Sequence, residues 1–240
     1  MSLSRALVLT FAFAVLAGSA CAKELNATIP AALVDPASNA GSQTIVLAGG
    51  CFWGIQGVYQ HVKGVTQVLA GYAGGAKATA TYDQVTTETT GHAESVQITY
   101  DPKVISLGHL LQIYFSVAHD PTELNRQGND EGPSYRSAIF FADAGQQSVA
   151  RAYIDQLNKA HIFDKPIATA LEPLKGFYMA EGYHQNFLIE AQVHHQDTQL
   201  YAQSWNYLVY NDIPKIAALR KVYPQMYRDD PVRVPKTLLH

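Results

Sequence analysis

The chain has 240 residues, a formal net charge of −3 and hydrophobic side chains at 48% of its positions. This length and apolar content suit a single domain with a full hydrophobic core. The slight acidity argues against nucleic acid as a natural partner, because proteins that bind nucleic acids carry clustered positive charge. After the N-terminal segment, no apolar run approaches the ~18 residues that a membrane helix needs.

Residues 1–22 have the pattern of a secretory signal peptide. Arg5 supplies a positive charge, residues 6–17 are apolar, and Ala20-Cys21-Ala22 resembles a signal-peptide cleavage site. Cleavage after Ala22 would remove Cys21 and send the protein to the periplasm or out of the cell. A lipid-modified Cys21 is the alternative, but Gly18-Ser19-Ala20 lacks the leucine of lipoprotein signals.

The rest of the chain is expected to hold one domain, residues 43–240, behind a flexible leader at residues 23–42. The leader mixes Ala, Pro, Ser and Asn without periodicity. Removal of the signal peptide would leave Cys51 as the single cysteine. An exported protein of this kind cannot form an internal disulfide and depends on its core for stability.

The first half of the domain alternates strands and helices. The apolar run 44–48 predicts a buried strand that ends at Gly49-Gly50. Apolar residues at helical spacing predict a short helix that ends at residue 61. Cys51 would lie at the N-terminus of this helix, which favours a thiolate. The further predicted elements are strands at 65–72 and 93–100, a loop at 71–90, and a helix capped by Ser106.

The second half begins with a polar loop at residues 121–133. The predicted elements that follow are a strand at 137–141, a helix after a capping box of Asp143 and Gln146, a strand at 167–171, and a helix at 213–222 in an otherwise irregular tail from residue 176. This order predicts an α/β (α+β) fold, a two-layer sandwich of helices over a largely antiparallel sheet. The core is expected to be a ferredoxin-like split βαβ unit with a long irregular C-terminal segment.

Cys51 is the first candidate for a reactive side chain. It lies in the run Gly49-Gly50-Cys51-Phe52-Trp53-Gly54. A free cysteine usually acts as a small buried apolar residue, but flanking glycines bring the backbone close and leave the sulfur accessible. The pattern favours a nucleophile, with a buried structural cysteine as the alternative.

Glu94 is the second candidate. On the predicted strand 93–100 it shares a face with Val96, Ile98 and Tyr100. A carboxylate on an apolar face is costly unless it is paired or protonated. Two interpretations stay open at this point: a strand-end side chain that reaches solvent, or a carboxylic acid with a raised pKa that donates a proton.

Motifs for metals and phosphates are weak. His92-Ala93-Glu94 resembles the H-x-E of zinc deaminases, but the chain has no P-C-x-x-C partner for it. His194 and His195 have no clustered ligands near them in the sequence, so a solvated pair is favoured over a metal site. No G-x-x-x-x-G-K-[ST] is present. The sequence therefore predicts no metal and no cofactor.

Four ordered segments resemble the peptide methionine sulfoxide reductases of the A class. They are Gly50-Cys51-Phe52-Trp53-Gly54, Gly91-His92-Ala93-Glu94, Gly128-Asn129-Asp130 with Tyr135-Arg136-Ser137, and Tyr183-His184-Gln185. The resemblance implies the same two-layer α/β fold. It also implies reduction of the S epimer of methionine sulfoxide, free or in proteins, through a sulfenic acid on Cys51.

The resemblance assigns catalytic roles to five residues. Cys51 would attack the sulfoxide sulfur, and Glu94 would protonate the sulfoxide oxygen. Tyr82 and Tyr135 would hydrogen-bond that oxygen, and Asp130 would shape the surroundings of the cysteine. The sulfur must be a thiolate while the acid is still protonated, so one site has to move two pKa values in opposite directions.

The resemblance also bears on substrate and partners. Phe52 and Trp53 would form an apolar pocket for the S-methyl group, and His184 is assigned to substrate binding. Many members of the class carry later cysteines that resolve the sulfenic acid, whereas this chain has none after Cys51. We therefore expect a monomer that is regenerated by an external thiol, either a thioredoxin-like or glutaredoxin-like protein or a small thiol.

Two other classes of function compete with this interpretation. One is another single-cysteine enzyme: a thiol peroxidase would react fast with hydrogen peroxide and not need Glu94, and a Cys-His hydrolase would form an acyl-enzyme with esters. A non-catalytic binding domain would have no need of a low-pKa thiol, which alkylation with iodoacetamide near pH 6 would reveal.

Overall fold

The computed structural model describes residues 28–38 and 40–239. The predicted signal peptide and Cys21 lie outside these residues. The strands are β1 Gln43–Ala48, β2 Val65–Ala73, β3 Ala93–Tyr100, β4 Arg126–Gln127, β5 Asp130–Glu131, β6 Ala138–Phe141, β7 Ala170–Pro173 and β8 Phe177–Met179. The α-helices are α1 Phe52–Gln60, α2 Tyr82–Val85, α3 Leu107–Ile113, α4 Ala144–Lys159, α5 Phe187–His194, α6 Gln199–Tyr207 and α7 Ile213–Val222.

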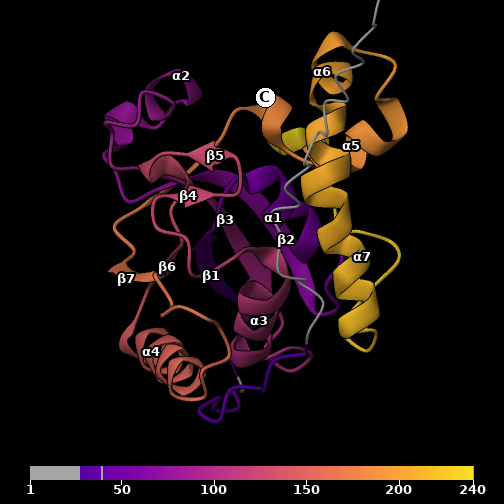
Figure 1. The fold of residues 1–240 in the computed structure, drawn as a ribbon. Coiled ribbons are helices and arrows are strands. Elements are labelled where there is room, and N and C mark those ends of the chain that lie inside the picture. The colour runs from indigo at the N-terminus through magenta and orange to yellow at the C-terminus, as the bar shows by residue number, and fades with distance from the viewer. Residues whose placement is uncertain (1–27, 39, 240) are drawn as a thin grey trace, which may run out of the picture.

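A six-stranded sheet in the order β7-β6-β1-β3-β2-β8 forms the centre of the molecule (Figure 1). Its neighbouring strands are antiparallel except for the parallel pair β6 and β7. Because β3 lies between β1 and β2 and runs antiparallel to both, β1 and β2 run in the same direction with α1 as their connection. This is the split βαβ unit that the sequence predicts.

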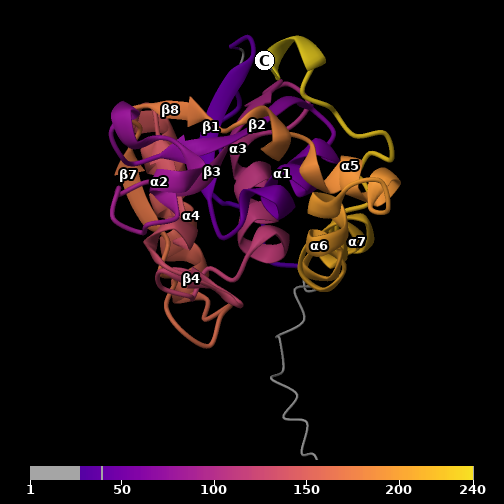
Figure 2. The same ribbon diagram turned by 90° about the horizontal axis from the view of Figure 1, so that it is seen from above.

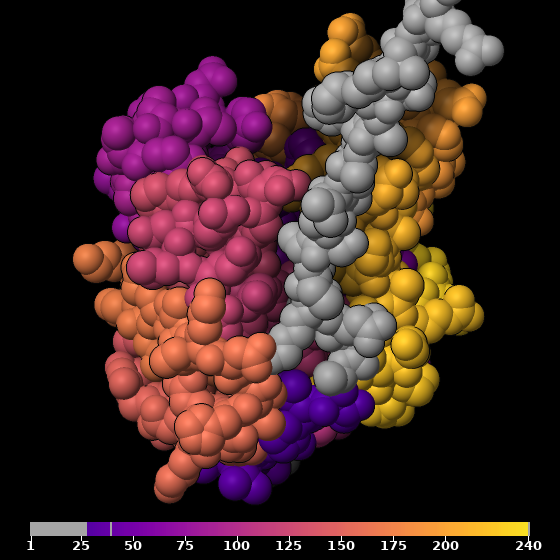
Figure 3. Space-filling view, in the orientation of Figure 1, coloured from indigo at the N-terminus to yellow at the C-terminus, as the bar shows by residue number. Residues whose placement is uncertain are grey.

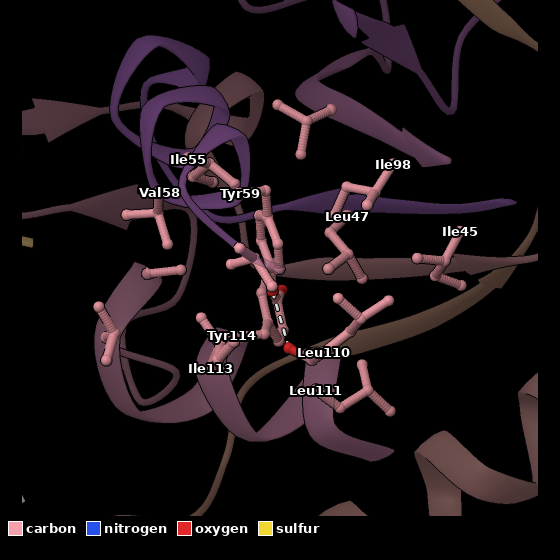
Figure 4. Packing of buried hydrophobic residues seen from close by; sticks show 14 of the residues in the cluster. Ile45, Leu47, Ile55, Val58, Tyr59, Ile98, Leu110, Leu111, Ile113 and Tyr114 are labelled. Atoms are coloured by element: carbon pink, nitrogen blue, oxygen red, sulfur yellow. Dashed lines mark hydrogen bonds between the residues drawn. The ribbon is translucent and has the colours of Figure 1, made fainter. Parts of the chain in front are cut away.

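The main core lies on one face of the sheet, where α1, α3 and α4 pack (Figures 1 and 2). Ile55, Val58 and Tyr59 of α1 meet the apolar side chains of β1 and α3 there (Figure 4). The buried Tyr59 hydroxyl donates a hydrogen bond to the Leu110 carbonyl at 2.8 Å. Burial of this face by three helices is the main apolar contribution to stability.

The opposite face of the sheet carries a smaller cluster. Its buried members are Val46, Ala48, Ala73, Ala93, Ala138 and Phe140. Side chains therefore alternate along β3, with Ala93 in this cluster and Val96, Ile98 and Tyr100 in the main core. The predicted N-caps are also confirmed, because Ser106 accepts from the His109 N–H and Asp143 from the Gln146 N–H.

The C-terminal segment is helical and not irregular, which corrects the prediction. It contains β8, α5, α6 and α7, and a π-helical turn, Leu208–Asp212, joins the last two helices. Helices α5, α6 and α7 lie together on one flank of the molecule (Figure 2), which is amber to yellow at the right of Figure 3. The helix predicted at residues 213–222 is confirmed as α7. Helix α5 was missed because it is apolar on most sides, and α6 because its apolar side consists of the half-buried aromatic residues Tyr201, Trp205 and Tyr207.

Part of the predicted flexible leader lies against the domain. Ile29 is buried, and its carbonyl accepts a hydrogen bond from Gln112 of α3. Tyr153 of α4 donates to the Pro30 carbonyl at 2.7 Å. In the described part of the chain, no helix is both long enough and apolar enough to cross a membrane.

Two further elements differ from the sequence-based expectation. The loop predicted at residues 71–90 contains the short helix α2, and the strand predicted at 167–171 lies at Ala170–Pro173. Parallel pairing with β6, from Ala138 opposite Ala170 onward, sets the position of this edge strand. Long-range pairing of this kind leaves little trace in the local sequence.

Candidate active site

Cys51 lies where β1 passes into α1, as predicted. The chain turns through Gly49 and Gly50 after β1, and Gly50 has a φ of +92°, a conformation that suits glycine. A Cβ on Gly50 would come within 2.7 Å of the Gln127 side chain, so the loop of β4 packs directly on this turn. Cys51 is the N-cap residue of α1 and is partly exposed.

Glu94 on β3 faces the main core, and its side chain is buried. Its Oε2 accepts a hydrogen bond from the backbone N–H of Phe52, in the first turn of α1, at 3.0 Å. Burial raises the pKa of Glu94 to about 8, and the nearby Asp130 adds to the effect, while the Phe52 N–H opposes it. Of the two open interpretations, the buried carboxyl group with a raised pKa is confirmed, and its role as a proton donor stays a prediction.

The thiol of Cys51 is also favoured in its protonated form. Burial raises its pKa well above the ordinary value, and the carboxyl groups of Glu94 and Asp212 add to the effect. The backbone N–H of Trp53 lowers the pKa, as expected at a helix N-terminus, but by less than burial raises it. The prediction of a low-pKa thiolate is therefore wrong for the resting site, because burial outweighs the helix.

One pocket of about 280 Å³ collects most of the predicted residues. Its lining consists of Cys51, Phe52, Trp53, Tyr82, Glu94, Asp130, Tyr135, Gln203, Ser204 and Tyr207. All five residues that were assigned catalytic roles are present, together with both aromatic residues of the expected S-methyl pocket. Their roles in the reaction stay predictions.

The two tyrosines that were predicted to bind the sulfoxide oxygen, Tyr82 and Tyr135, come from different parts of the chain. The backbone N–H of Tyr82 donates to Glu181 at 2.9 Å, which fixes the start of α2, and Tyr135 ends the 3₁₀ turn Pro133–Tyr135. Burial, followed by the charge of Glu94, raises the pKa of both Tyr82 and Tyr135. Both hydroxyls therefore stay protonated and can donate hydrogen bonds to an oxygen in the pocket.

One wall of the pocket comes from α6, a helix that the sequence did not predict. The Tyr207 hydroxyl donates to Asp130 Oδ2 at 2.5 Å, and Gln203 and Ser204 lie one turn earlier on the same helix. Burial raises the pKa of Tyr207 as well. No local signal distinguishes Tyr207 among the 14 tyrosines of the chain, because only the fold brings α6 to β5.

His184 lies behind the pocket and is not part of its lining. The Trp53 indole N–H donates to His184 Nδ1 at 3.1 Å, and the imidazole ring lies 4.9 Å from Phe52 and 4.7 Å from Tyr82 between ring centres. Burial lowers the pKa of His184 to about 4. This neutral ring supports three aromatic residues of the pocket, while the predicted contact with substrate stays a prediction.

The residues that the structure describes hold no group of three or more histidine, cysteine, aspartate or glutamate side chains that could bind a metal ion. The His92 ring contacts the backbone at Gly75 and Ala76 instead. His194 pairs with Asp197, and His195 stacks on Trp205.

Comparison with known proteins gives a consistent assignment. The family described as "Peptide methionine sulfoxide reductase" matches residues 43–211. A peptide methionine sulfoxide reductase MsrA 2 of Mesorhizobium japonicum is 51% identical over 84% of this chain and 97% of its own length. A protein of the same name from Synechocystis is 44% identical over 88% of this chain and 95% of its own.

Solved structures agree with the sequence relatives. Reduced Mxr1 from Saccharomyces cerevisiae is 34% identical, with a TM-score of 0.56 over 66% of this chain and 90% of its own. Methionine sulfoxide reductase A of Corynebacterium diphtheriae is 33% identical, with a TM-score of 0.54 over 65% of this chain and 77% of its own. With a pocket built around Cys51 and Glu94, a matching family pattern and relatives over most of its length, the chain belongs to the peptide methionine sulfoxide reductase family.

Proposed function

We propose that this chain reduces the S epimer of methionine sulfoxide to methionine, with Cys51 as the nucleophile. The observation that carries the proposal is a single pocket in which the thiol of Cys51, a protonated Glu94 and the hydroxyls of Tyr82 and Tyr135 lie together. A sulfoxide oxygen is a poor leaving group until it is protonated, so the reaction needs an acid that is still protonated near neutral pH. The pKa of about 8 at Glu94 meets this requirement.

The proposed step balances atoms and electrons. The Cys51 sulfur forms a bond to the sulfoxide sulfur while Glu94 gives its proton to the sulfoxide oxygen. The oxygen then passes to Cys51, the bond between the two sulfurs breaks, and methionine leaves. The sulfoxide sulfur gains two electrons, and Cys51 loses two and becomes a sulfenic acid. The proton that the thiol gives up restores Glu94.

The walls of the pocket suit this substrate. Phe52 and Trp53 give an apolar surface for the S-methyl group, and Trp53 is held in place by stacking on Phe187 with ring centres 3.7 Å apart. Tyr82 and Tyr135 offer neutral hydroxyls for the sulfoxide oxygen. Apolar contact on one side of the sulfur and hydrogen bonds on the other would select one epimer.

Regeneration is proposed to use an external thiol. The sequence has no cysteine after Cys51. A first thiol displaces the oxygen as water and forms a mixed disulfide with Cys51, and a second thiol releases Cys51. A thioredoxin-like protein, a glutaredoxin-like protein or a small thiol satisfies this chemistry. Export through the N-terminal signal, with loss of Cys21, is part of the same proposal and would place that reductant outside the cytoplasm.

A single-turnover reaction tests the proposal. The reduced protein is mixed with a peptide that contains methionine S-sulfoxide, without added thiol, and its intact mass is measured. We expect one methionine per protein and one oxygen atom added at Cys51, and neither in a Cys51→Ser variant. An unmodified Cys51 with no methionine formed would refute the function.

A further inference from the structure

A buried ion pair lies next to the pocket and has no part in the proposed step. The side chain of Asp212, at the end of the π-helical turn before α7, is fully buried, and that of Lys215 is 10% exposed. The Lys215 ammonium donates to Asp212 Oδ1 at 3.3 Å. Asp212 Oδ2 has no hydrogen-bond partner among the described residues. A buried pair of this kind is expensive to desolvate, so it calls for a reason beyond stability.

The pair packs on the first turn of α1, which begins directly after Cys51. A Cβ on Gly54 would come within 2.1 Å of Asp212 Oδ1 and 3.1 Å of Lys215 Nζ. Only a glycine at this position leaves room for the carboxylate. At the other end of the same loop, a Cβ on Gly49 would come within 2.7 Å of the buried His119 ring. Buried side chains therefore pack against both ends of the loop that carries Cys51, His119 at Gly49 and Asp212 at Gly54. Helix α7 also contacts α1 directly (Figure 1).

We propose that Asp212 and Lys215 form a positioning pair that holds the first turn of α1 at Gly54, three residues after Cys51, and places a carboxylate near the Cys51 thiol. Burial raises the pKa of Asp212, and the ion pair with the Lys215 ammonium opposes this rise. The carboxylate disfavours a second negative charge on the sulfur and so adds to burial and to Glu94 in keeping Cys51 as a thiol. Peroxide reacts with thiolates, and an over-oxidised cysteine is not recovered by thiols. Protection of this kind suits an enzyme that has no second cysteine.

Other groups also act on the Cys51 sulfur, and the test must separate them from Asp212. They are Glu94 on β3, Asp130 on β5, Tyr82 at α2, Tyr135 after β5, and Tyr207 on α6. Asp212 differs from all of them because it does not line the pocket. A change at Asp212 therefore alters the charge at the sulfur without removing a group that meets the substrate.

The pH profile of Cys51 alkylation tests the proposal. In the folded protein, iodoacetamide is expected to modify Cys51 of Asp212→Asn about tenfold faster than wild type at neutral pH, with the midpoint about one pH unit lower. Oxidation by hydrogen peroxide should accelerate in parallel. Asp229→Asn is the matched control, because Asp229 pairs with Arg220 of α7 at 3.4 Å but both side chains are mostly exposed. Its alkylation profile should coincide with that of wild type.

A second variant keeps the test informative if Asp212→Asn does not fold. Asp212→Leu combined with Lys215→Met replaces the pair by apolar side chains of similar size, which usually preserves stability. Its alkylation profile should also shift to lower pH, by less than that of Asp212→Asn, because the positive charge of Lys215 is removed as well. If both variants fold and keep the wild-type alkylation profile, the pair is only structural and the proposal is overturned, even where the melting temperature changes. The proposal rests on Cys51 as the reactive group of the proposed function. Alkylation needs no sulfoxide, however, so failure of the proposed role of Asp212 and Lys215 is distinguishable from failure of the proposed sulfoxide reduction.

Discussion

Two walls of the pocket are built in different ways. The sheet wall, Cys51, Phe52 and Glu94, is fixed by backbone pairing, since β1 and β3 are in register with Ala48 opposite Ser95. The residues that follow β1 and begin β3 must therefore meet. The helical wall, Gln203, Ser204 and Tyr207 on α6, is placed by packing of the C-terminal helices and by one hydrogen bond from Tyr207 to Asp130. The comparison suggests that the sheet wall performs the chemistry and that the helical wall adjusts it.

The largest effect is expected from Glu94→Gln on the sheet wall. Glutamine keeps the shape and an acceptor for the Phe52 N–H but cannot protonate the sulfoxide. We expect the single-turnover rate of methionine formation to fall ~10²-fold or more. Gln97→Ala is the control, because Gln97 lies on the same strand but its side chain points to the opposite face. Equal rates for Glu94→Gln and wild type would remove Glu94 from the mechanism.

The pH dependence of the rate gives the next largest effect. The productive state needs a Cys51 thiolate and a protonated Glu94, which is one proton fewer than the resting state at neutral pH. As the pH rises to about 8, the two groups Cys51 and Glu94 together lose one proton. Above this pH, each further gain in the fraction of Cys51 thiolate is matched by an equal loss of protonated Glu94. At low substrate, the single-turnover rate should rise about tenfold per pH unit below that value and then level off.

Glu94→Gln provides the comparison for this profile. With no acid to lose, its rate should continue to rise above pH 8 until Cys51 itself is ionised. A wild-type rate that is flat between pH 6 and 8 would show that the resting thiol is already ionised and would contradict the raised pKa of Cys51.

The same contrast explains what the sequence predicts and what it does not. The alternation along β3 and the glycines before Cys51 are local signals, and they placed Cys51 and Glu94 correctly at the junction and on the apolar face. The predicted ionisation of the Cys51 thiol was wrong, because the burial that raises its pKa depends on the whole fold. Tyr207 was missed because its partner Asp130 lies 77 residues earlier in the chain, and Asp212 because Cys51 and Gly54 lie far from it in the sequence. A tertiary contact of this kind has no local pattern.

Tyr207→Phe tests whether the helical wall acts on the chemistry. The change removes the hydroxyl that donates to Asp130 and leaves a lining carboxylate without this donor. A hydrogen bond to a charged group contributes roughly 1.5–3 kcal/mol, and we expect about a tenfold loss in single-turnover rate. Tyr210→Phe is the matched control, since Tyr210 follows α6 but is 79% exposed. Equal rates in the two variants would reduce Tyr207 to a packing role.

The smallest effect is expected at Gln203, at the exposed edge of the helical wall. Its amide can donate to and accept from a peptide backbone that continues out of the pocket, and free methionine sulfoxide has no such backbone. One neutral hydrogen bond contributes about 0.5–1.5 kcal/mol. Gln203→Ala should therefore raise KM for a peptide substrate a few-fold and leave KM for the free amino acid unchanged. Gln199→Ala, one turn earlier on α6 and outside the pocket lining, should affect neither. If both substrates respond equally, the helical wall contacts the sulfoxide itself, and the division of labour between the two walls does not hold.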